Sequence, residues 1–208
     1  MSSSLAAGGF RVKLCLFSLI VPLVAGFAQE DINVSRVAHD AQVTVTVAKF
    51  ATLATLASDG TVNARVIYPK PPNASVGESP ALHYIRFATT AQSRKYEEIL
   101  DNPNATLVYY DYAGKGEVTL KGYIVVCNSS EAAEGWYERW RINYPQGPQT
   151  PGYKLLRFET RALEFVSIDR FHVDEGGSRQ DWRPLTLSRS PHGAWRYVPP
   201  PHEVREFV

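Results

Sequence analysis

The stretch FATLATLASDGTVNARVIY, residues 50–68, carries the clearest structural pattern in this chain of 208 residues. Apolar side chains alternate along residues 50–57 and again along residues 61–68, and the tripeptide Ser-Asp-Gly separates the two runs. Alternation with a period of two is typical of a half-buried strand, and a short Asp-Gly loop between two such runs is typical of a hairpin. The pattern predicts an antiparallel β-hairpin over residues 50–68.

Further strand patterns follow this hairpin, with turn residues between them. The predicted strands are residues 81–88, 105–111 and 117–127, one broken strand or two strands over residues 153–168, and a last hairpin of residues 183–189 and 193–198. Seven or eight strands in hairpin order, with two or three short helices inserted, indicate a closed antiparallel barrel. The sequence therefore predicts an α+β fold, mainly β, in a single domain over residues 29–208.

Three segments have a helical pattern. Residues 31–49 place apolar side chains at helical spacing, although QVTVTV within them alternates like a strand, and we favour the helix. Residues 128–142 form another predicted helix. The third covers residues 89–100, where Thr89 and Gln92 have the spacing of a capping box and the apolar face would hold Tyr96, Ile99 and Leu100.

The first 28 residues differ from the rest of the chain. Arg11 and Lys13 precede an uncharged run, residues 14–26, that ends in small residues. A basic start, an apolar stretch of about a dozen residues and small residues before a cleavage point are typical of a secretory signal peptide. We expect residues 1–28 to be such a peptide, with an uncleaved anchor as the alternative. No later stretch is long and apolar enough to span a bilayer.

Other features agree with export through the secretory pathway, to the extracellular space or an endomembrane compartment. The Asn-x-Ser/Thr sequons, which are candidate glycosylation sites, are Asn33, Asn73, Asn104 and Asn128. Cys15 lies within the predicted signal peptide, so Cys127 has no partner for an internal disulfide. We predict that Cys127 is a buried and unreactive thiol.

Charge and histidine spacing exclude two classes of function. Loss of residues 1–28 would remove two cations and no anion, which leaves 20 Lys and Arg against 21 Asp and Glu. A nucleic-acid-binding protein would need a strongly basic surface, so a nucleic-acid partner is not expected. The five histidines are scattered without the spacing of metal ligands, so we expect no metal site.

Two cations, Arg94 and Lys95, stand in the first turns of a predicted helix, where the backbone is already partly positive. One explanation is local pairing, because both lie at helix-neighbour spacing from Glu98. The other is an anion that the sequence does not show. Free backbone N–H groups, the hydroxyl of Ser93 or Thr90 and the two cations would together bind a phosphate. The residues alone leave both explanations open.

Two more cations precede this helix in the chain. Arg65 lies on the second strand of the hairpin, and Lys70 follows it by five residues. If the first sheet folds back on residues 81–95, all four cations would face one phosphate. The alternative is a solvated surface, which is the commoner environment for a single lysine such as Lys70.

Residues 51–70, 85–111 and 116–124 together resemble the FMN-binding split-barrel superfamily. This superfamily includes pyridoxamine 5'-phosphate oxidase and the flavin proteins similar to general stress proteins. The most specific parts of the resemblance are Thr89 with Ser93-Arg94-Lys95, between a strand and a helix, and Arg65 in ARVIYPK. The resemblance implies a Greek-key split β-barrel, a homodimer and FMN as the cofactor.

The resemblance also implies site residues. Its positions for the FMN phosphate and ribityl chain correspond here to Arg65, Lys70, Thr89, Ser93, Arg94 and Lys95. Glu117 stands where the oxidase has a glutamine that contacts the flavin ring, and an ionised carboxylate can only accept hydrogen bonds. Arg139 and Arg179 lie near positions where the oxidase uses arginines, and they are candidates for binding a substrate.

Two functions fit these expectations. The first is an FMN-dependent oxidoreductase that acts on a small molecule, in which the flavin accepts a hydride and passes electrons to an acceptor. The second is a secreted glycoprotein without catalysis, which keeps the barrel and binds a partner or a cofactor. The colour of the purified protein distinguishes a flavin-loaded protein from one without flavin.

Overall fold

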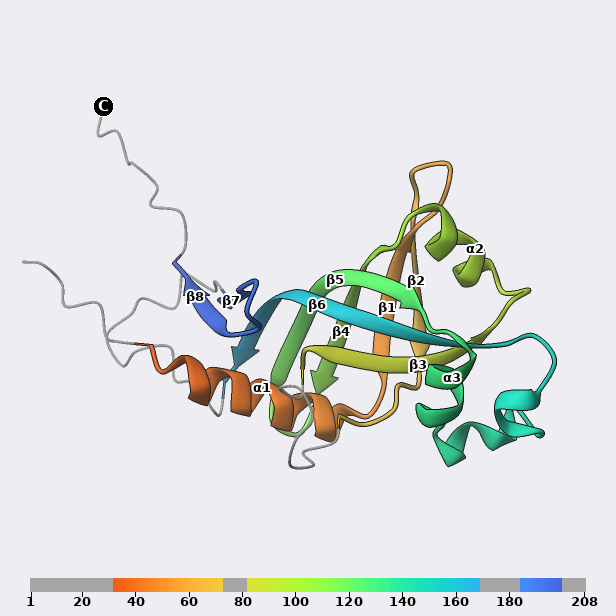
Figure 1. The fold of residues 1–208 in the computed structure, drawn as a ribbon. Helices are drawn as coiled ribbons and strands as arrows, with labels where there is room; N and C mark the ends of the chain where they lie inside the picture. The colour runs from red at the N-terminus through yellow and green to blue at the C-terminus, as the bar shows by residue number, and fades with distance from the viewer. Residues whose placement is uncertain (1–31, 73–81, 169–183, 200–208) are drawn as a thin grey trace, which may run out of the picture. The chain divides into compact units, whose positions relative to one another are not determined.

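The predicted hairpin is present in the computed structural model, which describes residues 32–72, 82–168 and 184–199 (Figure 1). β1 (Ala51–Leu56) pairs antiparallel with β2 (Val62–Ile67). The Asp59 carboxylate stabilises the turn by accepting hydrogen bonds from the backbone N–H and the hydroxyl of Thr61. Alternate side chains of β1 are buried, as a period of two predicts.

One antiparallel sheet of eight strands joins the described residues, in the order β2-β1-β4-β5-β6-β7-β8, with β3 paired to β6. The bounds of the other strands are β3 (Tyr84–Thr90), β4 (Asn104–Asp111), β5 (Gly116–Val126), β6 (Tyr153–Ser167), β7 (Leu185–Arg189) and β8 (Trp195–Val198). The N–H of Lys70, just after β2, donates to the carbonyl of Arg86 on β3 at 2.8 Å. The predicted fold, an α+β antiparallel split barrel that is mainly β, is confirmed.

β6 is one long strand, and it connects most of the sheet. It pairs with β5 along one edge, and with β3 and then β7 along the other. The register between β5 and β6 shifts at Lys121/Gly122. A Cβ atom on Gly122 would lie 2.0 Å from the carbonyl oxygen of Glu159. Glycine is therefore required where the two backbones approach this closely.

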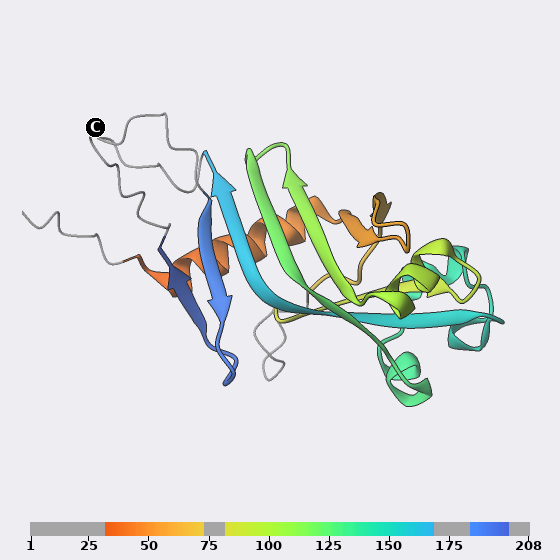
Figure 2. The same ribbon diagram turned by 90° about the horizontal axis from the view of Figure 1, so that it is seen from above.

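α1 (Val34–Ala48) confirms the helical interpretation of its segment. The Asn33 side chain caps the helix by accepting the backbone N–H of Arg36 at 3.0 Å. Its buried side chains, which pack against β4 and β5, are Val37, Ala41, Thr44 and Val45. Figures 1 and 2 show the helix lying across these strands. Helical spacing places these four side chains on one face, whereas a strand would divide them between two faces.

α2 (Arg94–Asp101) begins later than predicted. β3 continues through Thr90, because Thr89 and Thr90 pair with the first residues of β6. Ser93 is the N-cap, and its side-chain oxygen accepts the N–H of Tyr96. The predicted capping box of Thr89 and Gln92 is therefore wrong, since strand pairing fixes Thr89 in an extended conformation.

The helix predicted over residues 128–142 is divided. The short helices of this part of the chain are α3 (Ser129–Glu134), η1 (Glu138–Ile142) and η2 (Gly147–Gln149). Asn128 and Glu131 form a reciprocal capping box at the start of α3. The division falls at Gly135, where a Cβ atom would lie 2.4 Å from Cδ2 of Leu155. After this division, Trp136 and Trp140 pack near Tyr153 at the start of β6.

Two apolar clusters pack around the sheet. The main cluster fills the barrel beneath α1, and its largest fully buried side chains include Tyr109, Phe87, Phe158 and Phe165. The second cluster packs the short helices against the Tyr153 end of β6 and consists of Cys127, Trp140, Tyr144, Tyr153 and Leu155. Cys127 is buried, as predicted, and burial raises the pKa of its thiol.

Several predictions fall on residues that the structure does not describe. The signal peptide of residues 1–28, the sequon at Asn73 and the candidate substrate residue Arg179 lie outside the described residues. The described residues belong to one compact unit, Ile32–Val208. Within the described ranges, no helix has the length and apolar character needed to cross a membrane.

Candidate functional site

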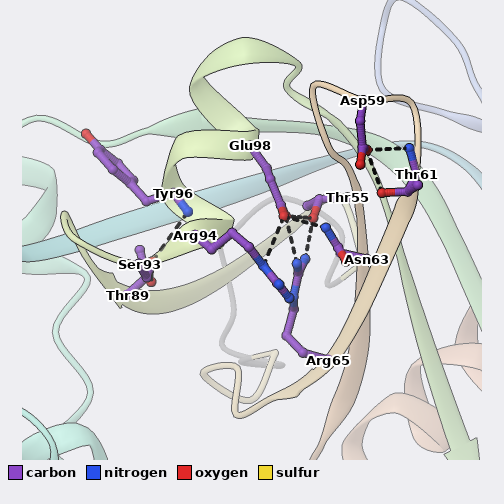
Figure 3. A network of polar contacts seen from close by, with 10 residues as sticks. All are labelled: Thr55, Asp59, Thr61, Asn63, Arg65, Thr89, Ser93, Arg94, Tyr96 and Glu98. Carbon is purple, nitrogen blue, oxygen red and sulfur yellow. Dashed lines mark hydrogen bonds and ion pairs between the residues drawn. The ribbon is translucent and has the colours of Figure 1, made fainter.

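The first hairpin presents polar side chains to α2. In the register of β1 with β2, Thr55 lies directly opposite Asn63, and Arg65 is two residues further along the same face of β2. Thr55 is 2% exposed, so this face points into the molecule. Figure 3 shows all three side chains turned toward α2.

α2 directs one carboxylate at these side chains. Glu98 is 5% exposed and lies beside the buried Ile99, whereas Leu100 is 60% exposed. Each residue turns an α-helix by about 100°, so when positions 98 and 99 both face inward, position 100 points about 150° away from their mean direction, toward solvent. The predicted apolar face is therefore wrong for Leu100, and a charged side chain takes the inward position.

Both oxygens of the Glu98 carboxylate have partners (Figure 3). Oε2 accepts hydrogen bonds from the Thr55 hydroxyl and, at 2.7 Å, from Arg65 Nη2. Oε1 accepts from Asn63 Nδ2 at 2.7 Å, and Arg94 Nε lies 3.3 Å from the same oxygen. Arg65 also donates to the Thr55 hydroxyl through Nη1. The hairpin and α2 therefore meet at a single buried carboxylate.

The charges around Glu98 are not balanced. Burial raises the pKa of Glu98, but hydrogen bonds from Thr55 and Arg65 outweigh burial and hold this pKa below its usual value. Burial and the nearby charge of Arg65 lower the pKa of Lys95, and Glu98 opposes this shift. With Arg65, Arg94 and Lys95 protonated and Glu98 ionised, the cluster carries a net charge of +2.

The start of α2 adds hydroxyl groups beside these cations. The Ser93 hydroxyl lies 2.7 Å from the hydroxyl of Thr89, and it also caps the helix through the N–H of Tyr96. Thr89 is 1% exposed, so its hydroxyl can orient Ser93 but does not face solvent. Ser93 is half-buried and is the hydroxyl of this pair that a ligand could reach.

The structure brings together Arg65, Ser93, Arg94 and Lys95 among the residues predicted from sequence. Lys70 lies three residues after β2, and its backbone N–H donates to the carbonyl of Arg86 on β3. Among the described residues, no hydrogen bond or ion pair joins the Lys70 side chain to the Glu98 cluster. From the sequence, Glu98 was expected only as an ion-pair partner, and Thr55 and Asn63 were not predicted as site residues. Their positions on the same face of the hairpin as Arg65 could have indicated them.

Glu117 lies on the opposite face of the sheet from Arg65. Val118 and Leu120 on β5 are buried, so the side chain of Glu117 points outward and is exposed. It lies opposite Tyr110 of β4, and its Oε1 accepts from the Thr119 hydroxyl at 3.4 Å. Because successive side chains of a strand point to opposite faces of the sheet, Glu117 and the Arg65 cluster lie on different faces within one chain.

Arg139 belongs to a separate aromatic cluster. Its Nη1 donates to the hydroxyl of Tyr68 at 3.3 Å, and the rings of Tyr68 and Phe50 are 5.1 Å apart. A hydrogen bond with Tyr137, and then one with Arg139, lowers the pKa of Tyr68. No sequence pattern joins Tyr68, which directly follows β2, to η1.

The three described sequon asparagines are exposed. Asn33 and Asn128 are the N-caps of α1 and α3, and their Oδ1 atoms accept backbone N–H groups. Asn104 begins β4, and its Nδ2 donates to the Asn102 side chain at 2.9 Å. Whether these side chains carry glycans stays a prediction.

The fold and the clustered cations define a split-barrel protein with a candidate anion site at one end of the barrel. A family model described as pyridoxamine 5'-phosphate oxidase matches residues 38–167, which is more than half of the chain. The chain therefore belongs to the pyridoxamine 5'-phosphate oxidase family. A search of curated proteins finds no match.

Solved structures share this fold. One is a Clostridium acetobutylicum protein related to general stress protein 26 (TM-score 0.57, 16% identity, covering 73% of this chain and 93% of that one). Another is an FMN-binding protein from Nostoc punctiforme related to pyridoxamine 5'-phosphate oxidase (TM-score 0.54, 14% identity, covering 78% of this chain and 93% of that one). A third is PhzG from Burkholderia lata, in complex with tetrahydrophenazine-1-carboxylic acid (TM-score 0.53, 20% identity, covering 80% of this chain and 90% of that one). At these identities the likeness shows the fold alone.

Proposed function

We propose that this protein binds FMN, with the phosphate held between β2 and the start of α2, and that it is an oxidoreductase of a small molecule. The observation that carries the proposal is the convergence of Arg65 from β2 with Ser93, Arg94 and Lys95 from the start of α2. These residues stand at the phosphate-binding positions that the family resemblance implies. The Nostoc punctiforme structure of the same fold is that of an FMN-binding protein.

The charge of the cluster fits a phosphomonoester. A phosphate group of this kind carries about −1.5 to −2 at neutral pH, which is close to the +2 of Arg65, Arg94 and Lys95 with Glu98. Arginine donors suit phosphate because their N–H groups form charge-assisted pairs. The lowered pKa of Lys95 also fits, since an anion placed beside it would stabilise the charged ammonium.

A second copy of the chain would complete the flavin site. The outer face of the sheet carries exposed apolar side chains, with Val62 and Val66 each 70% exposed and Tyr110 57% exposed. Tyr110 lies opposite Glu117, so a partner that covers this face also covers Glu117. In the proposed homodimer, Glu117 contacts the flavin that the other copy holds, as the resemblance implies.

The bound flavin would supply hydride and electron transfer. The residues of this chain would bind the phosphate, orient the ring and leave one ring face open to a substrate. The exposed Arg139, held by its hydrogen bond to Tyr68, is the described candidate for contacting an anionic substrate. The oxidoreductase proposal rests on the family to which the chain belongs.

One observation favours the second candidate function, a binding protein without catalysis. Arg65 and Arg94 already have an anionic partner in Glu98, so the cluster has a structural role even without a phosphate. A protein of this kind would keep the barrel and would not need a flavin.

The absorbance spectrum of the purified full chain tests the proposed function. We expect flavin bands and release of FMN on denaturation, identified by its mass. If the protein loses its flavin during purification, we expect titration with FMN to restore the bands. Riboflavin, which lacks the phosphate, is the matched ligand, and we expect it to bind at least tenfold more weakly. A colourless protein that binds neither ligand would overturn the proposal.

We also propose that the chain enters the secretory pathway and carries N-linked glycans. The described sequons at Asn33, Asn104 and Asn128 are exposed, which is compatible with modification. Treatment of the protein from eukaryotic cells with a glycosidase should lower its mass. An unchanged mass would argue against this route.

A further inference from the structure

Glu98 is the residue of the proposed phosphate site whose charge opposes phosphate binding. An ionised carboxylate near a phosphate repels it, and Glu98 is held in its ionised form. We propose that Glu98 is a resident anion of this site: it holds Arg65 and Arg94 in the ligand-free protein, and an arriving phosphomonoester must share these arginines with it. Glu98 then sets the affinity of the site and keeps it below what the cations alone would give. This inference rests on the proposed function.

The geometry allows the two arginines to be shared. A guanidinium has five N–H donors, and Arg65 uses Nη2 for Glu98 and Nη1 for Thr55, so further donors remain. The Arg65 side chain is 19% exposed, which leaves part of it accessible. Arg94 is 73% exposed and contacts Glu98 through Nε at 3.3 Å, so it can turn toward a phosphate at little cost.

Glu98 also has a role before any ligand binds. The charged groups that face it are Arg65 from β2, and Arg94 and Lys95 from its own helix, while β1 and β2 add the neutral Thr55 and Asn63. Arg65 lowers the pKa of Lys95, which means that the two cations repel each other, and Glu98 counteracts this repulsion. Without an internal anion, the ligand-free protein would hold like charges together in a partly buried site.

Glu98 is buried and held in a fixed position within the site. It is 5% exposed, and both of its oxygens are bonded to side chains of the hairpin. Glu97, its neighbour on α2, is exposed, and within the described ranges its side chain makes no hydrogen bond or ion pair. The two glutamates therefore have the same charge and are neighbours on the same helix, but their side chains lie in different environments.

The substitution Glu98→Gln tests the proposal, with Glu97→Gln as the matched control. Glutamine keeps the shape of the side chain, and the Asn63 amide can rotate to accept from the new N–H groups. We expect Glu98→Gln to tighten binding of both FMN and inorganic phosphate about tenfold, equivalent to about 1.4 kcal/mol. Glu97→Gln should change either affinity by less than about threefold, and riboflavin binding should change in neither variant. Isothermal titration and flavin fluorescence measure these affinities.

The outcomes separate this proposal from the proposed function. If the wild type binds FMN and Glu98→Gln binds it equally or more weakly, the resident-anion role is overturned and the cofactor stands. If only Glu98→Gln binds FMN and phosphate, the resident-anion role is supported and FMN binding by the natural protein is not. If the wild type and both variants bind neither, both proposals fail.

A measurement on the wild-type protein covers the case in which Glu98→Gln does not fold. The ¹³C signal of the Glu98 carboxyl group is followed as a function of pH, with and without saturating inorganic phosphate. A second anion beside Glu98 disfavours its ionised form, so we expect phosphate to raise the pKa of Glu98. A pKa that does not change with added phosphate would overturn the proposal.

Discussion

The direction of a few side chains decides what the first hairpin can bind. Thr55, Asn63 and Arg65 face α2 because they share one face of the β1–β2 pair. A slip of one residue in this register would send Arg65 to the outer face and leave the Glu98 carboxylate buried without its closest cation. The loss would be large, because an uncompensated buried charge costs several kcal/mol. The ion pair therefore also specifies the register.

Arg94 offers the most direct test of the phosphate contact. We predict that Arg94→Glu lowers FMN affinity at least tenfold, because the change places an anion beside a dianionic phosphate. Arg94 is 73% exposed, so the fold should be retained. Arg36→Glu, at a side chain of α1 that is 68% exposed, makes the same charge change elsewhere and should leave the affinity unchanged. Equal FMN titrations for Arg94→Glu and the wild type would remove Arg94 from the site.

The burial of His83 leads us to predict a loss of stability in mild acid. Burial, and then the charge of Arg189, lowers the pKa of His83 below 6.5. The unfolded chain, with a histidine pKa near 6.5, then binds more protons than the folded chain, so the free energy of unfolding falls as the pH drops below about 6.5. One histidine contributes at most about 1.4 kcal/mol per pH unit.

Urea unfolding between about pH 7 and pH 5 measures this effect. His83→Gln should flatten the pH dependence in this range. His192, which is exposed, provides the control, and His192→Gln should leave the slope unchanged. An unchanged slope in His83→Gln would show that other groups cause the dependence.

The sequence could predict the cations of the candidate site but not its centre. Ser93, Arg94 and Lys95 are adjacent in a specific motif, and Arg65 stands at a motif position on the hairpin. The burial of Glu98 depends on how α2 packs against the hairpin, where Thr55, Asn63 and Arg65 bind its carboxylate. Such a long-range contact cannot be read from helical periodicity, so the apolar pattern assigned the inward position to Leu100.

Among the elements, β5 and β6 approach each other most closely at Gly122 of β5. Most strands could be predicted because each has its own alternation, but the single long β6 could not, since its two halves read as separate patterns. Both halves pair with β5, and the register shifts between them at Lys121/Gly122, where the two backbones approach closely. The helix predicted over residues 128–142 is wrong for a similar reason, because α3 ends at Gly135, whose close contact with Leu155 is not visible in the local pattern.

We predict that Gly122→Ala destabilises the fold by about 1–3 kcal/mol, because the new methyl group would overlap the Glu159 backbone. Gly116→Ala on the same strand is the comparison. Its Cβ would lie 3.3 Å from the Thr44 hydroxyl, a much longer contact than the 2.0 Å at Gly122, so the loss should be smaller. Thermal unfolding of the three proteins gives the order. Equal stabilities for Gly122→Ala and the wild type would contradict the close approach.

At the level of the whole molecule, the outer face of the sheet is the interface of the proposed homodimer. We predict that Val66→Glu shifts the protein from dimer to monomer, because Val66 is exposed in one chain and a partner would bury the new charge. Ile142→Glu, at another exposed apolar side chain, on η1, should leave the assembly unchanged. Sedimentation velocity measures both. A wild type that is monomeric throughout would remove the homodimer from the proposed function.

The pairing of β3 constrains how this protein can be made. The described residues of the Glu98 cluster all precede β4, yet β3, which leads directly into α2, pairs with β6 alone among the described strands. Tyr84 is matched to Glu159 and Thr90 to Tyr153, so β3 has no strand partner until that part of the chain has been synthesised. During translation, the cation cluster therefore cannot reach its final arrangement before β6 has been synthesised. A nascent chain stopped before β6 would hold all of these charged side chains without the strand that fixes the start of α2.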